Sequence, residues 1–112
     1  MPRKPTVDEL RLITNLVSKA NDLQLPINWS EKILVKTMSD GGMGSLRLDI
    51  SGLFSKDRIF GKQVSECKFI DIDAVEVIAS LYVDQNGDLF ELDIWKTNFE
   101  KLKQIPKNFK DV

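Results

Sequence analysis

An Asn-Gly pair set between two β-rich runs constrains this chain more than any other part of its sequence. Residues 75–83 and 89–95 are rich in Val, Ile, Leu and aromatic side chains, and they flank Asn86 and Gly87. Asn and Gly tolerate the positive φ that a type I′ turn requires at both of its central positions. The sequence therefore predicts a tight antiparallel hairpin over residues 75–95.

A turn centred on Asn86 and Gly87 also sets the register of this hairpin. It pairs Gln85 with Asp88 and then, moving away from the turn, Val83 with Phe90, Leu81 with Leu92 and Ala79 with Ile94. Side chains alternate along a strand, so the last six of these residues are expected on one face, in the core. The opposite face would then carry acids, aromatics and an Ile, namely Glu76, Ile78, Ser80, Tyr82, Glu91, Asp93 and Trp95.

Helix signals precede the hairpin. Thr6 and Glu9 form a Thr-x-x-Glu capping box, in which each side chain accepts a hydrogen bond from the backbone N–H of the other residue. Apolar residues then recur at helical spacing as far as Ala20. We expect a helix that starts at Thr6 and ends near Asn21 or Asp22.

Strand signals and a second capping box complete the pattern. Residues 33–38, 45–50 and 63–72 read as strands, with Phe54 and Phe60 as core anchors between them, and Thr97 with Glu100 predicts a short helix over residues 98–104. The expected fold is α+β, with the N-terminal helix packed on a mostly antiparallel meander sheet of four to five strands and a short C-terminal helix. A single domain over residues 1–112 is expected, with residues 1–5 and 107–112 flexible.

The lack of histidine narrows the possible chemistry. The chain has no His and one Cys, Cys67, which we expect to be a small buried hydrophobe. His-based acid–base catalysis, Ser-His and Cys-His nucleophile pairs and Cys/His metal sites are excluded, and so is an internal disulfide. We expect a protein that is not an enzyme and has no cofactor. No secretory h-region and no apolar run of the ~20 residues that span a bilayer is present, so a cytoplasmic protein without membrane contact is expected.

The charges are segregated along the chain although the net charge is only −1. Residues 66–93 hold eight acids against Lys68 alone, which gives −7, and residues 96–112 hold five Lys against Glu100 and Asp111, which gives +3. Such segregation bears on binding partners and not on fold. An acidic sheet argues against nucleic-acid binding and favours a basic protein partner.

The acids of this segment leave three interpretations open. Asp71, Asp73 and Glu76, with Glu91 and Asp93, could be a solvated outer face, a patch that meets a basic partner, or a divalent-cation or acid–base site. No EF-hand spacing is present. Tyr82 and Trp95 share the expected face, where they would either anchor a partner or pack beneath residues 98–109.

A glycine-rich loop offers a second candidate site. Its residues Asp40, Gly41, Gly42, Gly44 and Ser45 resemble a phosphate cradle, because successive backbone N–H groups can bind an anion. No Gly-Lys-Ser/Thr ending and no following helix accompany the loop, so a hairpin loop that needs glycines for positive φ is the competing interpretation.

Several short motifs together resemble a family of small uncharacterised bacterial proteins, a domain of unknown function. They include Trp29, the Asp-Gly-Gly-Met-Gly-Ser-Leu stretch over residues 40–46 and the Phe-Glu-Leu-Asp-Ile-Trp-Lys-Thr stretch over residues 90–97. This resemblance implies no activity, cofactor or catalytic residue. The ending of the chain is also loosely similar to immunity proteins of bacterial toxin systems, which neutralise a toxin by binding it, many of them with an acidic surface.

Three hypotheses for function follow. The first is a non-catalytic protein-binding module, in its sharpest version immunity-like, that meets a basic partner through Glu76, Tyr82, Glu91, Asp93 and Trp95. The second is a small-ligand or metal-binding protein that uses Asp40, the loop from Gly41 to Gly44 and nearby carboxylates. The third is a structural homo-oligomer joined by sheet edges or by the Tyr82 face.

Overall fold

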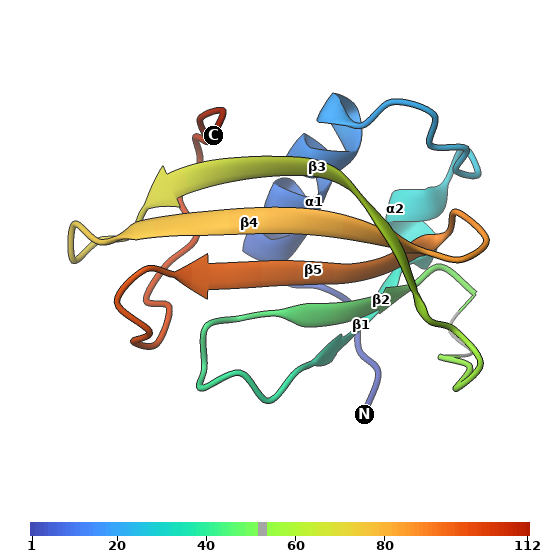
Figure 1. Ribbon diagram of the computed structural model, residues 1–112, viewed down its shortest axis with the longest axis horizontal. Helices are drawn as coiled ribbons and strands as arrows, with labels where there is room; N and C mark the ends of the chain where they lie inside the picture. The colour runs from blue at the N-terminus through green and yellow to red at the C-terminus, as the bar shows by residue number, and fades with distance from the viewer. Residues whose placement is uncertain (52–53) are drawn as a thin grey trace.

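The computed structural model describes residues 1–51 and 54–112, in which two helices precede five strands (Figure 1). In chain order the elements are α1 (Val7–Lys19), α2 (Trp29–Lys32), β1 (Leu34–Thr37), β2 (Leu46–Asp49), β3 (Phe60–Ile70), β4 (Glu76–Asp84) and β5 (Leu89–Lys96). The expected α+β class, with one N-terminal helix and an antiparallel sheet, is confirmed.

The five strands form one antiparallel sheet in the order β1-β2-β5-β4-β3. The meander is limited to β3, β4 and β5, which pair in succession. The hairpin of β1 and β2 joins this meander through β2 and β5, where Leu46 lies opposite Leu92 and Arg47 opposite Glu91. The pairing of β2 with β5 places β5 in the middle of the sheet, with β2 on one side and β4 on the other.

Helix α1 covers one face of the sheet. The capping box is present as expected, with Thr6 and Glu9 bonded to each other's backbone N–H, and the helix ends at Lys19, slightly before the expected end. The helix buries Leu12, Ile13 and Leu16 against β3 and β4. Figure 1 shows α1 and α2 together behind the sheet, with no layer in front of it. We call the face in front the outer face and the face beneath α1 the core face.

The central hairpin forms, but its turn is not type I′. The Gly87 N–H donates to the Asp84 carbonyl oxygen, and only Gly87 has a positive φ, of 85°. This is a type I turn followed by a left-handed glycine, in which the Asp84 carboxylate accepts the N–H groups of Asn86 and Asp88. The turn therefore begins one residue earlier than expected.

The altered turn changes the register next to it. Leu81 still faces Leu92 and Ala79 still faces Ile94, as predicted, but Val83 faces Leu89 across a bulge, so its predicted pairing with Phe90 is wrong. Phe90 is the extra residue of the bulge and lies outside the core cluster. A bulge places two successive side chains on one side of a strand, which moves Phe90 to the outer face.

The predicted C-terminal helix over residues 98–104 is wrong, because the described chain after Lys96 contains no helix. The short helix of the fold is α2, between α1 and β1. The Thr97 N–H and hydroxyl both donate to the Glu76 carbonyl oxygen, and Phe99 takes a left-handed φ of 62°. These contacts turn the chain out of the helical path, and the expected cap between Thr97 and Glu100 does not form.

The two terminal segments lie along the two edges of the sheet. Arg3 pairs with Val35 on β1, and Lys110 pairs with Lys68 on β3, each through two backbone hydrogen bonds. Phe109 packs edge-on against Phe69 at 5.9 Å between ring centroids. A segment paired on an edge strand satisfies N–H and C=O groups that would otherwise be open to another chain.

Candidate functional site

One transverse row of side chains crosses the outer face from edge to edge. The strand registers place Lys36 opposite Arg47, Arg47 opposite Glu91, Glu91 opposite Tyr82 and Tyr82 opposite Gln63. Residues directly opposite on antiparallel strands point to the same side of the sheet. The row therefore runs from cations on β1 and β2, through a carboxylate on β5, to an aromatic ring on β4.

The predicted partner-binding residues lie together on β4 and β5. Below the row, Asp93 faces Ser80 and Trp95 faces Ile78, while Glu76 lies at the start of β4. The packing of α1 on the core face leaves this outer side without a covering layer. The structure thus gathers Glu76, Tyr82, Glu91, Asp93 and Trp95 on a single open surface.

Two further aromatic rings extend this surface. Phe60 lies 5.1 Å from Tyr82 and Phe99 lies 6.2 Å from Trp95, measured between ring centroids. Phe60 is 59% exposed and Phe99 is 70% exposed, so the expectation that Phe60 anchors the core is wrong. We call the four rings Phe60, Tyr82, Trp95 and Phe99 the aromatic rim.

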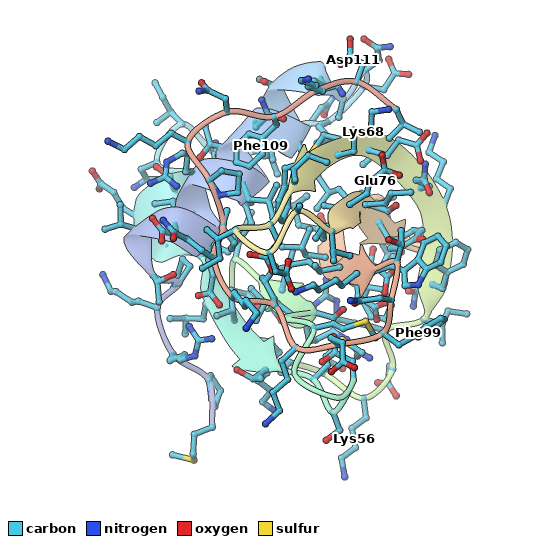
Figure 2. All side chains as sticks on the ribbon, turned by 90° about the vertical axis from the view of Figure 1, so that its left-hand side faces the viewer. Lys56, Lys68, Glu76, Phe99, Phe109 and Asp111 are labelled. Atoms are coloured by element: carbon cyan, nitrogen blue, oxygen red, sulfur yellow. The ribbon has the colours of Figure 1, made fainter. Side chains whose placement is uncertain are left out.

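Residues 98–109 do not bury the outer face. Ile105 is buried in the core cluster, and Leu102 and Phe109 pack against that cluster. Figure 2, which looks along the strands, shows Phe109 on the side of α1 and Phe99 on the opposite side. The sequence alternative that places Tyr82 and Trp95 beneath this segment is therefore wrong, and Trp95 stays 40% exposed.

Two of the acids in residues 66–93 belong to a buried ion cluster. The Lys96 ammonium, fully buried on the core face, lies 2.9 Å from an Asp71 oxygen and 2.6 Å from an Asp73 oxygen. It also donates to the Lys101 carbonyl oxygen. Burial lowers the pKa of Lys96, but the two carboxylates outweigh it and hold that pKa above its usual value. Asp71 is thus neutralised inside the protein, and Asp73, whose side chain is 27% exposed, is paired with Lys96 at the surface.

A third acid, Asp84, is neutralised by Arg58. The Arg58 guanidinium lies 2.8 Å from Asp84 and 3.2 Å from Asp49, and it donates to the carbonyl oxygens of Leu48 and Leu89. Burial raises the pKa of Asp84, yet the hydrogen bonds from Arg58 and from the turn N–H groups bring it below its usual value. No local pattern in the sequence marks Arg58, because its partners come from three separate strands or their ends.

Fewer acids remain on the outer face than the eight that the sequence holds in residues 66–93. Glu91 has Arg47 at 3.8 Å and Glu76 has Lys68 at 4.0 Å, both long for ion pairs. Burial raises the pKa of Glu91 and of Asp93, and the neighbouring charge of Asp40 raises that of Asp93 further. Glu91 and Asp93 are therefore held as carboxylates in surroundings that do not fully compensate their charge.

Hydrogen bonds to the Asp40 carboxylate hold the glycine-rich loop in its conformation. The Asp40 carboxylate accepts the N–H groups of Met43 and Ser45, and the Gly42 carbonyl oxygen accepts the N–H of Leu102. Gly41, Gly42 and Gly44 all have positive φ. Two of the N–H groups that an anion would need are already used, and this geometry favours the hairpin-loop interpretation.

The structure also bears on metal binding, membrane insertion and the reactivity of the thiol. Across residues 1–51 and 54–112, no group of three or more Cys, Asp or Glu side chains is arranged to hold a metal ion. Over the same ranges, no helix is long and apolar enough to cross a membrane. The buried Cys67 has its pKa raised to about 11 by burial, so its thiol is protonated at neutral pH.

Comparison with known protein families gives a match over most of the chain. The model of a family described as "Domain of unknown function (DUF6984)" matches residues 2–106. No curated protein and no solved structure matches the chain.

Proposed function

The chain belongs to the family described as Domain of unknown function (DUF6984), and we propose that it is a non-catalytic protein-binding module that uses the outer face of its sheet. The observation that carries this proposal is the aromatic rim. Four rings lie as two pairs, Phe60 with Tyr82 and Trp95 with Phe99, on a face without a covering layer, and three of them are at least 40% exposed. Aromatic residues of this kind supply most of the binding energy at protein interfaces.

The acids beside the rim support a basic partner. Glu91 lies opposite Tyr82, and Asp93 lies between Glu91 and Trp95 along β5; both acids have raised pKa values. A partner that brings Lys or Arg to this position would relieve the mutual repulsion of the two carboxylates. The proposed partner is a basic protein, and neutralisation of a basic toxin by an immunity-like mechanism is the sharpest form of the proposal.

The experiment compares capture of a partner by three purified proteins. The unaltered chain, a Trp95→Ala variant and an Ile27→Ala control are immobilised, exposed to a lysate of the native host, and the captured protein is then purified and its Kd measured directly. Ile27 is a fully exposed apolar residue on the loop between α1 and α2, away from the sheet. We expect Trp95→Ala to weaken binding at least about tenfold, in the range of an interface hot spot, and the control to leave it unchanged.

A second experiment with the same captured partner tests whether the charges of Glu91 and Asp93 contribute to binding. Glu91→Lys combined with Asp93→Lys should abolish binding, and added salt should slow association of the unaltered chain. Equal affinity of the double variant and the unaltered chain would exclude this face as the interface. A solution mass of two or more chains that falls to one chain in Trp95→Ala would instead show that the rim joins copies of this protein.

A further inference from the structure

The basic end of the outer face contains a cavity that the protein-binding proposal does not use. It has a volume of about 320 Å³ and lies between β1, β2 and residues 54–58. Its lining carries four cationic side chains and no acidic one, namely Lys36, Arg47, Lys56 and Arg58. Phe54 supplies an apolar wall. We infer that this cavity binds a small organic dianion, such as a phosphate monoester or a dicarboxylate.

The cavity is built by specific contacts and is not a chance gap between exposed lysines. The Asp49 carboxylate accepts the N–H groups of Ser51 and Phe54 and pairs with Arg58, which fixes residues 54–58 against the end of β2. The Arg58 side chain is only 12% exposed. Its N–H groups donate to the Asp84 carboxylate and to the carbonyl oxygens of Leu48 and Leu89. Arg58 is therefore a structural wall whose charge is already balanced.

The other three cations have weaker compensation than Arg58: Arg47 has one long ion pair and stacks on the Phe90 ring at 4.4 Å, and the two lysines have no ion pair among the described residues. Lys36 and Lys56 have no carboxylate within ion-pair distance in the part of the chain that the structure describes, and the Lys36 ammonium lies 5.0 Å from the centre of the Phe54 ring. Arg47 reaches Glu91 only at 3.8 Å. The Arg47 Nε–H is buried and has no hydrogen-bond partner. A buried donor without an acceptor is costly, and it leaves Arg47 with unused hydrogen-bonding capacity beside the cavity.

The number and position of these groups indicate the charge and size of the ligand. Lys36 and Arg47 are directly opposite each other on β1 and β2, so their charges converge on one point of the outer face. Lys56 projects from the loop at the lower edge of the molecule, where it can fold over a bound group (Figure 2). Two unpaired ammonium groups match a dianion. The volume lies at the lower end of the roughly 300–1,000 Å³ of small-molecule pockets, which suits a compact organic molecule.

Titration of the full chain with three salts, followed by backbone amide NMR shifts, tests the site. Phenyl phosphate and malonate represent the two sources of a dianion, and chloride at matched ionic strength is the monoanion control. We expect saturable shifts at residues 36–38 and 54–58 with at least one dianion, and the tighter of the two identifies the ligand class. Shifts no larger than those caused by chloride would overturn the inference.

A matched pair of variants separates the site from general charge effects. Lys36→Gln removes one cation from the cavity, and Lys68→Gln makes the same change at the opposite edge of the same face. Loss of one charge a few ångströms from the ligand should weaken binding about fivefold in Lys36→Gln. Equal affinities of the two variants would overturn the inference. This result is independent of the protein-binding proposal, whose test uses Trp95, Glu91 and Asp93.

Discussion

Asp93 shows how a single carboxylate can be held on a surface at a cost to the fold. It lies opposite Ser80 on β4 and near Asp40, and no basic side chain pairs with it among the described residues. Burial and the charge of Asp40 together raise its pKa. A group that costs stability where it stands is typical of a site kept for binding.

Asp93→Asn should therefore stabilise the protein at pH 7. The pKa of Asp93 is higher in the folded state than in the unfolded state, so the ionised side chain lowers the free energy of unfolding at pH 7. At a pH below the unfolded-state pKa of about 3.9, Asp93 is protonated in both states and this destabilisation vanishes. We expect a gain of roughly 0.5 kcal/mol at pH 7, small because solvent screens the face. Urea unfolding at pH 7 and at pH 3 measures it.

The gain should disappear at pH 3, and that disappearance identifies the charge as its cause. Asp88→Asn, the same substitution at an exposed position of the hairpin loop, is the control. An Asp93→Asn variant that is equally or less stable than the unaltered chain at pH 7 would contradict the assignment.

The β4–β5 hairpin shows how an element can keep its strands while its turn differs from the expected type. Asn-Gly was expected to fill both central positions of a type I′ turn, but the Asp84 carboxylate accepts two N–H groups of the loop and favours a type I turn that starts at Asp84. Strand pairing beyond the bulge is unaffected, because alternating apolar side chains fix which residues face the core.

Substitutions in the turn distinguish the two turn types. Gly87→Ala should destabilise the protein by about 1 kcal/mol, since Gly87 has a φ of 85° and no atom lies close enough to clash with an added Cβ. Asn86→Ala should cost much less, because the φ of Asn86 is not positive. Thermal unfolding of the two variants measures the difference. Equal losses would support the type I′ turn instead.

At the scale of the whole molecule, an ion cluster around the buried Lys96 ammonium joins the connection between β3 and β4 to the chain after β5. Lys96 at the end of β5 bonds to Asp71 and Asp73 in the connection between β3 and β4, and to the carbonyl oxygen of Lys101 after β5. Asp71 also accepts the N–H groups of Lys103 and Gln104. Two segments distant in the sequence, residues 71–73 and 96–104, thus meet at this cluster, which directs the C-terminal residues to the core face and leaves the outer face open.

Asp71→Asn should lower the stability of the whole fold. The variant keeps the shape of the side chain but leaves the buried Lys96 ammonium with Asp73 as its remaining carboxylate partner. Removal of one member of a buried ion cluster typically costs about 3 kcal/mol. Urea unfolding measures the loss, with Asp88→Asn as the exposed control. A loss no greater than that of the control would show that the cluster does not hold the segments together.

Features that depend on local geometry could be predicted from the sequence. The cap at Thr6 and Glu9 and the pairings of Leu81 with Leu92 and Ala79 with Ile94 follow from hydrogen bonds within one turn and from side-chain alternation. The sequence also placed the candidate binding residues on one side of the hairpin.

Which charges and rings reach that side depends on the packing of the folded chain. The acids of residues 66–93 appear as one block in the sequence, but Lys96 and Arg58 neutralise Asp71, Asp73 and Asp84. The pairing of β2 with β5 brings Arg47 beside Glu91 and creates a basic end that no local pattern predicts. The physical reason is that charge compensation and burial depend on groups from distant segments, whose meeting is set by the packing of the whole chain.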